Sequence, residues 1–129
     1  MQFKRVLVTG AGGLLGREVV TALSGHCTVV GFDLAKGDAD IEWFEGDVTD
    51  PDVVSRAVTG CDAVVHVAAI PNIVSGTGTD IVRVNVAGTW TVFNAAHTAG
   101  VRRVVLCSSD SVVGFTVLQG KMVRPQYLP

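Results

Sequence analysis

A cluster of glycines lies between the first apolar segment of the chain and the first segment with helical spacing. It occupies residues 9–16 (TGAGGLLG), where Gly10, Gly13 and Gly16 recur at every third position. Glycine at these positions permits a tight turn, close approach of a phosphate to the backbone, and close packing of the helix that follows. The N–H groups and the dipole at the start of that helix favour an anion. The run therefore predicts a pyrophosphate site; the alternative is a tight turn that binds nothing.

An acidic residue, Asp33, follows the second β-branched segment and lies 17 positions after Gly16. A carboxylate at the end of such a strand can accept hydrogen bonds from the ribose hydroxyls of an adenine dinucleotide. It would repel the additional phosphate of NADP, and Leu34 follows it where an arginine or lysine would welcome that phosphate. Together with the glycine run, Asp33 predicts NAD rather than NADP; the alternative is a solvated aspartate in a loop.

These residues need alternating strands and helices to bring them together. Apolar runs predict strands over 3–9, 27–32, 41–44, 63–67 and 101–107, and helical spacing predicts helices over 14–23, from Asp50–Pro51 onward, and over 81–99. Strands that are apolar throughout are typical of a parallel sheet covered on both faces. We therefore predict an α/β fold, a Rossmann-type doubly wound parallel sheet of about five strands that is truncated at its C-terminal side.

The composition excludes several classes of protein. Of the 129 residues, 48% are hydrophobic and 17% charged, and the 15 glycines follow no collagen-like period, so a disordered or collagenous chain is excluded. No apolar run reaches the roughly 20 residues of a membrane span. With a net charge of −2 and no basic stripe, nucleic acid is not expected as a partner. The first residues lack the features of a signal peptide, so we expect a cytoplasmic protein in which Cys27, Cys61 and Cys107 are reduced core thiols.

Six segments, in this order along the chain, resemble the extended short-chain dehydrogenase/reductase family, the group of NAD-dependent sugar epimerases and dehydratases. The glycine run is similar to the TGxxGxxG of that family, and Asp33 matches its ribose-binding acid. The other four similar segments are 46–50 (GDVTD, around the adenine in the family), 65–69 (VHVAA, beside the cofactor), 84–89 (VNVAGT) and 105–114 (the serine segment of strand five). We therefore expect an NAD-binding portion over 1–114.

The resemblance implies which residues contact the cofactor. They are Gly10, Gly12, Gly13, Leu14, Leu15, Gly16, Asp33, Leu34, Asp47, Val48, Val67, Ala68, Ala69, Asn85 and Ser108. Asp47 and Asp50 also fit an exposed turn and a helix N-cap, and His66 is expected to be a core histidine rather than a catalytic group. Asn85 is unfavourable inside a helix and predicts a buried hydrogen bond, which the resemblance places near the nicotinamide.

The resemblance further implies hydride transfer through a serine or threonine and the pair Tyr-x-x-x-Lys. Ser109 matches the catalytic serine, with Ser108 and Ser111 as its neighbours, whereas Val113 stands where the family has an aromatic residue.

No Tyr-x-x-x-Lys pair occurs in the sequence. Tyr127, the single tyrosine, has no lysine four positions later, and the ending RPQYLP is similar to the family's loop upstream of the catalytic helix. Lys121 fits no motif and is expected to be a solvated loop lysine. We therefore expect residues 115–129 to be a loop that precedes a missing catalytic helix and substrate domain.

Three hypotheses about function remain open. The chain is the NAD-binding portion of a nucleotide-sugar epimerase, dehydratase or reductase, or a non-catalytic NAD-sensing or interaction module, or a structural fragment that binds nothing. The segments do not distinguish the reactions, and a nucleotide sugar is a partner only if the remainder is present. Strand five would be an apolar edge, which predicts self-association or pairing with a missing segment.

Overall fold

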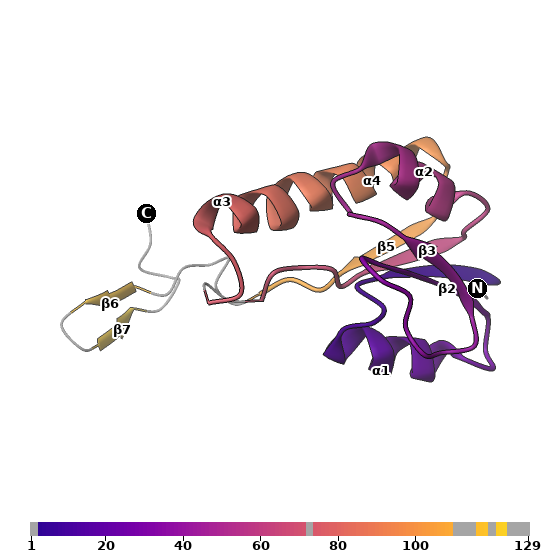
Figure 1. The fold of residues 1–129 in the computed structure, drawn as a ribbon, viewed down its shortest axis with the longest axis horizontal. Helices are drawn as coiled ribbons and strands as arrows, with labels where there is room; N and C mark the ends of the chain where they lie inside the picture. The colour runs from indigo at the N-terminus through magenta and orange to yellow at the C-terminus, as the bar shows by residue number, and fades with distance from the viewer. Residues whose placement is uncertain (1–2, 72–73, 110–115, 119–120, 124–129) are drawn as a thin grey trace.

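A computed structural model describes residues 3–71, 74–109, 116–118 and 121–123, with only the backbone of the last two segments. Its centre is a five-stranded parallel sheet with helices on both faces (Figure 1). The strands are β1 (Arg5–Thr9), β2 (Thr28–Asp33), β3 (Glu42–Glu45), β4 (Ala63–His66) and β5 (Arg103–Leu106), in the order β3-β2-β1-β4-β5. This is the order of a doubly wound sheet, so the predicted fold class is confirmed.

The helices divide between the two faces of the sheet, as Figure 1 shows. Helix α1 (Leu14–Leu23) covers one face, and α2 (Pro51–Val58) packs with the long helix after β4 on the other. That long helix consists of α3 (Gly78–Ile81), a π-helical segment η1 (Val82–Gly88) and α4 (Thr89–Thr98). It begins before the predicted position 81 because Thr77 and Asp80 form a capping box.

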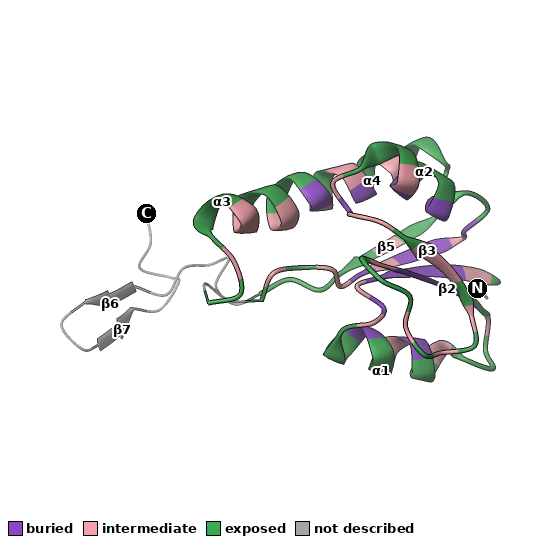
Figure 2. Cartoon of the chain, viewed as in Figure 1, coloured by how far each residue is buried: buried purple, intermediate pink, exposed green. Residues whose placement is uncertain are grey.

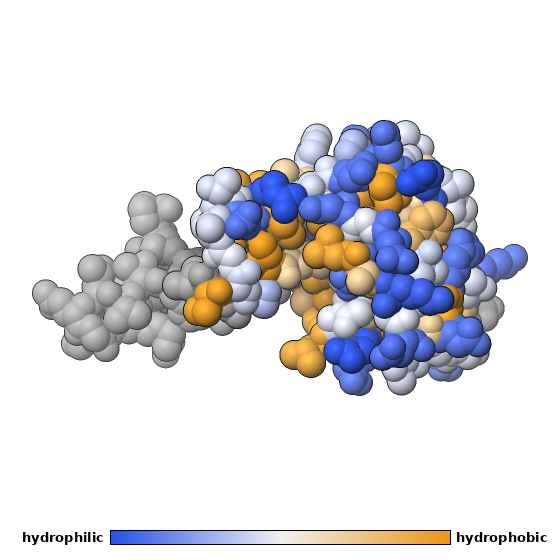
Figure 3. Space-filling view, in the orientation of Figure 1, coloured by the Kyte–Doolittle hydropathy of each residue, from blue (hydrophilic) through white to orange (hydrophobic). Residues whose placement is uncertain are grey.

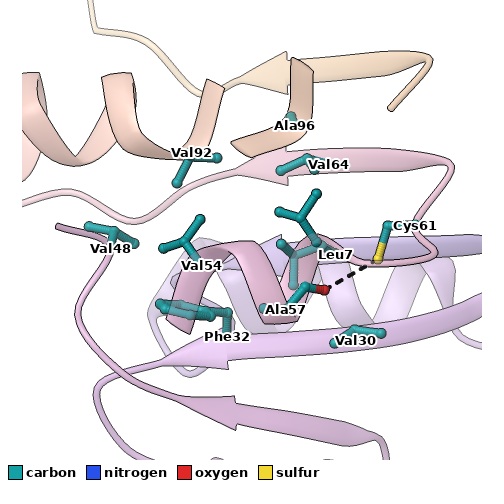
Figure 4. Packing of buried hydrophobic residues seen from close by; sticks show 11 residues of the cluster. Leu7, Val30, Phe32, Val48, Val54, Ala57, Cys61, Val64, Val92 and Ala96 are labelled. Atoms are coloured by element: carbon teal, nitrogen blue, oxygen red, sulfur yellow. Dashed lines mark hydrogen bonds between the residues drawn. The ribbon is translucent and has the colours of Figure 1, made fainter. Parts of the chain in front are cut away.

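Each strand of the sheet places alternate side chains in one of two apolar clusters. Leu7, Val30 and Val64 lie under α2 and α4, together with Val54 of α2 and Val92 of α4 (Figure 4). The side chains of β1 and β2 that point the other way pack under α1. The β1–β2–β4 centre of the sheet is therefore buried on both faces, as its continuous apolar runs predict.

The outer strand β5 departs from this expectation. Val105 and Leu106 are 51% and 43% exposed, and Figure 2 shows β5 as largely exposed beside the buried central strands. Cys107, directly after β5, is exposed, so its prediction as a core thiol is wrong; Cys61 is buried and Cys27 half-buried, and all three are free thiols. Strand β5 and Cys107 are exposed because β5 is the last strand on its side of the sheet.

The C-terminal region contains two short strands where we predicted loop. Strands β6 (Thr116–Leu118) and β7 (Lys121–Val123) pair antiparallel, so Lys121 begins a strand rather than lying in a loop. Three residues are too few for strand alternation to stand out in a sequence. Of the helices in the described residues, none has the length and apolar character needed to cross a membrane.

Candidate dinucleotide-binding site

The predicted site residues gather along one edge of the sheet, where the parallel strands end. The glycine loop follows β1, Asp33 ends β2, Asp47 follows β3, and residues 67–70 follow β4. The connections from β1 and β4 run in opposite directions from the centre of the sheet. The chain passes from β1 to β2 on one side and from β4 to β5 on the other. Open α/β sheets bind ligands in the crevice at such a switch point.

Two glycines of the loop are required by close backbone contacts. Gly10 has a φ of +69°, and a Cβ atom there would lie 2.7 Å from the backbone nitrogen of Ala68, at the exit of β4. A Cβ on Gly16 would lie 2.7 Å from the carbonyl carbon of Gly10 and 2.8 Å from Cα of Ala11. The loop is thus pressed against both α1 and β4, which explains the tight turn and the close helix packing.

Gly13 differs from these two glycines because it is exposed and its contact with the neighbouring backbone is looser. The nearest atom to a Cβ placed there is the Gly10 carbonyl oxygen at 3.3 Å, and Gly13 is exposed. It is the N-cap residue of α1, and no side chain caps this helix end within the described residues. An uncapped helix N-terminus beside a glycine with room in front of it fits a pyrophosphate.

Apolar side chains surround this helix end. Leu14 is 88% exposed, Leu15 is 48% exposed, and Leu34 on the neighbouring loop is 73% exposed. Large apolar side chains left in water beside a polar cradle are typical of a ligand-binding surface.

The Asp33 carboxylate is held over the glycine loop. One oxygen, Oδ2, accepts from the Gly12 N–H at 2.8 Å, and the other, Oδ1, accepts from the Leu34 N–H at 2.7 Å. A Cβ on Gly12 would lie 3.2 Å from Oδ2, so glycine there keeps the loop close to the acid. Each carboxylate oxygen has a second lone pair, and these fit the hydroxyl donors of a ribose.

The Asp47 carboxylate lies in the turn after β3 and is paired with a residue of the π-helical segment. Arg83 Nη1 donates to its Oδ2 at 2.8 Å, and the Thr49 N–H and hydroxyl each donate to its Oδ1 at 2.9 Å. Burial favours a higher pKa for Asp47, but the hydrogen bonds from Arg83 and Thr49 outweigh burial and hold the pKa below its usual value. The acid is therefore ionised and fixed in one orientation.

A chain of hydrogen bonds crosses from β1 to the long helix through His66. Its Nδ1 lies 2.6 Å from the Thr9 hydroxyl oxygen, and its Nε2 lies 3.0 Å from the Thr89 hydroxyl oxygen. The Thr89 hydroxyl in turn donates to the Asn85 carbonyl at 2.7 Å. The Thr9 oxygen accepts the N–H groups of Val67 and Ala68, so we assign its proton to a bond with Nδ1 and the ring proton to Nε2.

Burial explains why His66 takes part in this chain as a neutral ring. The residue is 1% exposed, and burial lowers its pKa to about 4. A neutral imidazole with both nitrogens engaged holds two elements together and has no lone pair left for a substrate proton. The expectation of a core histidine is confirmed.

The side chain of Asn85 forms hydrogen bonds to the backbone of the segment after β4. Its Oδ1 accepts from the Ile70 N–H at 2.8 Å and its Nδ2 donates to the Ile70 carbonyl at 3.0 Å. This is the hydrogen-bonded asparagine that its unfavourable place in a helix predicts, although Asn85 is half-buried rather than fully buried. These two hydrogen bonds fix the path of the backbone after β4, where Val67, Ala68 and Ala69 lie.

The predicted residues after β5 are described only in part. Ser108 and Ser109 follow β5 and are exposed, whereas Ser111, Val113 and Tyr127 lie outside the described residues. Asp50 is the N-cap of α2 and accepts from the Asp52 and Val53 N–H groups, as expected. Within the described residues, no three His, Cys, Asp or Glu side chains are grouped so that they could hold a metal ion.

Three residues of this network were missed by sequence reasoning. Thr9 and Thr89 bind His66 on either side, and Arg83 pairs with Asp47. A polar Thr9 at the end of an apolar strand is a signal that could have been read. Arg83 lies 36 positions from its partner and carries no such signal.

The fold and the site together define a dinucleotide-binding α/β protein of the doubly wound class. Residues 6–123 match the sequence model of the NAD dependent epimerase/dehydratase family, and the chain belongs to that family. The predicted family is confirmed, and with it the prediction that the family uses NAD.

Similar proteins differ in what they act on. A 3 beta-hydroxysteroid dehydrogenase/Delta 5→4-isomerase of Mycobacterium tuberculosis is 43% identical over 121 residues, which cover 84% of this chain and 32% of that protein. A solved short-chain dehydrogenase/reductase superfamily protein from Agrobacterium tumefaciens with bound NAD has a TM-score of 0.76 and 38% identity, over 85% of this chain and 34% of its own. MoeE5 in complex with UDP-glucose and NAD has a TM-score of 0.78 and 32% identity, over 87% and 38%. The chain thus spans between 32% and 38% of the length of these proteins.

Proposed function

We propose that this chain is the NAD-binding portion of an oxidoreductase of the nucleotide-sugar epimerase/dehydratase type. The observation that carries the proposal is the 2.8 Å hydrogen bond from the Gly12 N–H to Asp33. It brings the acid that would bind a ribose against the loop that would bind a pyrophosphate, so that one ligand spans both. NAD, when bound, supplies the hydride acceptor.

The remaining residues divide along the length of such a ligand. The open N-terminus of α1 at Gly13 accommodates the pyrophosphate, and Leu14, Leu15 and Leu34 shield it from water. Asp47 and the following Val48 hold the adenine. Towards the nicotinamide lie Val67, Ala68, Ala69 and Asn85, with Gly10 and Gly16 keeping the loop close and Ser108 at the exit of β5.

Ser109 is the residue that we propose to contact a substrate. It follows β5 directly and is exposed, so its hydroxyl can hold the substrate oxygen at which a proton leaves or arrives. Transfer of that proton needs the Tyr-x-x-x-Lys pair, which the sequence lacks. We propose that the segment supplying this pair and the substrate-binding part belong to the portion of the family that this chain does not span.

We propose that the substrate class is determined by that portion, which this chain does not span. MoeE5 is described with UDP-glucose, while the M. tuberculosis relative is a hydroxysteroid dehydrogenase. A nucleotide sugar is our proposed substrate for the complete enzyme, and a non-catalytic NAD-sensing module is the alternative. Turnover of nucleotide sugars after a segment carrying Tyr-x-x-x-Lys is added would decide for the enzyme.

The exposure of the outer strand β5 suggests that another polypeptide segment packs against it. Val105 and Leu106 leave apolar surface on both sides of β5. We propose that β5 pairs with a second copy of the chain or with a segment that completes the sheet. Light scattering at tens of micromolar that finds only monomers would contradict pairing between copies.

Calorimetric titration with NAD tests the proposed binding. We expect a dissociation constant below about 1 mM for the wild type and no measurable binding for Gly13→Val, because the added side chain fills the space in front of the helix end. A Gly13→Val variant with wild-type affinity would place the ligand elsewhere. Circular dichroism of the variant serves as the folding control, because a Cβ at Gly13 would make a tight contact of 3.3 Å with the Gly10 carbonyl oxygen.

A further inference from the structure

Asp47, Thr49 and Arg83 form a closed ring of hydrogen bonds beside the proposed adenine position. Arg83 Nη1 donates to Asp47 Oδ2 at 2.8 Å and to the Thr49 hydroxyl at 2.9 Å, and this hydroxyl donates to Asp47 Oδ1 at 2.9 Å. Both hydrogens of Nη1 are thus used within the protein. The ring fixes the carboxylate more firmly than a single ion pair would, because each member is held from two sides.

The ring also decides how much of the carboxylate is left for a ligand. Oδ1 accepts from both the N–H and the hydroxyl of Thr49, and Oδ2 accepts from Arg83. A carboxylate offers about four lone pairs, so one position on Oδ2 remains. The N–H of the next residue, Val48, has no hydrogen-bond partner among the described residues. An acceptor and a donor therefore stand on adjacent residues.

This pair of groups matches one purine better than another. Adenine presents an amino donor next to the N1 acceptor, which complements an oxygen acceptor and an N–H donor. Hypoxanthine presents a carbonyl acceptor next to an N1–H donor and mismatches both. A polar site built for one pattern rejects the other, because the bound base excludes water and leaves the mismatched groups without hydrogen-bond partners.

The π-helical segment η1 places Arg83 where it can close the ring. Residues five apart lie on one side of a π-helix, and Arg83 and Gly88 both contact the turn after β3. A Cβ on Gly88 would lie 2.7 Å from Cγ2 of Val48, so the helix approaches this turn closely at one end while Arg83 reaches it from the other. Figure 3 shows apolar side chains interrupting the hydrophilic surface over this helix.

We propose that Arg83 is a positioning residue that orients Asp47 and so sets the selectivity of the site for adenine over hypoxanthine. The inference rests on the proposed function, since it takes the turn after β3 as the adenine site. Arg83 acts through Asp47 and need not touch the cofactor. Its side chain is 50% exposed, and the Asp47 carboxylate is 33% exposed.

The test compares NAD with nicotinamide hypoxanthine dinucleotide, which differs only in the base and carries the same charge. Calorimetric affinities are measured for the wild type, Arg83→Ala and Arg102→Ala. Arg102 is the matched control, because it also forms a half-exposed ion pair, with Asp62, but at the opposite edge of the sheet. The two dinucleotides carry the same charge, so any general loss of attraction in a variant affects both alike and cancels in the ratio of their affinities.

We expect the wild type and Arg102→Ala to bind NAD about tenfold more tightly than the hypoxanthine dinucleotide, and Arg83→Ala only about threefold more tightly. An Arg83→Ala ratio equal to that of the wild type would overturn the inference while leaving NAD binding, and hence the proposed function, intact. Loss of selectivity in Arg102→Ala as well would overturn it too, since the effect would then not be local. A wild type that binds neither dinucleotide overturns both proposals.

Discussion

His66 links the stability of this fold to pH. The ring is 1% exposed, and burial lowers its pKa from the usual 6.5 to about 4. In the unfolded chain the imidazole takes up a proton near pH 6.5, whereas in the folded chain it stays neutral until about pH 4. The contribution of His66 to stability is therefore complete above pH 6.5 and is lost as the pH falls towards 4.

The size of this loss follows from the two pKa values. Between pH 7.5 and pH 5.0 the free energy of unfolding falls by about 2 kcal/mol on account of His66. Asp47, Asp62 and Asp80 also have lowered pKa values, but their unfolded-state protonation is centred near 3.8 and contributes little above pH 5. The interval from pH 7.5 to 5.0 thus isolates the histidine among these groups.

Urea denaturation followed by circular dichroism at pH 7.5 and pH 5.0 measures the effect. The matched variant is His66→Asn, which can still accept the Thr9 hydroxyl proton but does not titrate in this range. We expect it to be less stable than the wild type at both pH values and to lose less than about 0.5 kcal/mol between them.

Two results would refute this reasoning. One is a variant that loses as much stability as the wild type between the two pH values. The other needs no variant: an NMR titration of the folded wild type in which His66 gains its proton near pH 6.5 would show that burial does not control the ring.

Two further predictions concern the packing around this site. Gly16→Ala should destabilise the fold by about 2–3 kcal/mol or prevent folding, because its Cβ would lie within 2.8 Å of the Gly10 and Ala11 backbone. The control is Gly78→Ala, whose Cβ meets no atom within 4 Å and which should change stability by less than about 1 kcal/mol. Equal melting temperatures for the two variants would contradict the contact. Thr89→Val should cost about 1–3 kcal/mol, because it leaves the His66 Nε2–H without its acceptor, while the Thr91→Val control, at a hydroxyl that bonds only within the helix at Ala87, should cost less than about 0.5 kcal/mol. A Thr89→Val loss no larger than that of the control in chemical denaturation would argue against the assigned chain of hydrogen bonds.

The parts of the fold that depend on local pattern could be predicted from the sequence. Segments rich in apolar residues predicted all five strands of the parallel sheet to within two residues at each end, and Asp50 before Pro51 predicted the start of α2. The doubly wound class of the sheet, although not the order of its strands, followed from right-handed connections between such elements. Glycine spacing indicated a tight turn, which the positive φ of Gly10 bears out.

The parts that depend on distant partners could not be predicted. The pairing of Arg83 with Asp47 joins residues 36 positions apart, and the π-helical segment that enables it is too short, at 7 residues, to show its own spacing in the sequence. The exposure of Cys107 depends on what covers β5 rather than on its own apolar segment. Both the Arg83–Asp47 pairing and the exposure of Cys107 depend on how distant segments pack, which no local pattern in the sequence reveals.

The most direct test of the central claim is the relative affinity of the chain for NAD and NADP. The two ligands differ by one phosphate on the ribose that Asp33 would hold, and the carboxylate is fixed there by Gly12 and Leu34. We predict that calorimetry gives at least about tenfold tighter binding of NAD, and that Asp33→Ala removes most of this difference. Equal affinities of the wild type for both ligands would contradict the assignment of Asp33, and with it the site that joins this acid to the glycine loop.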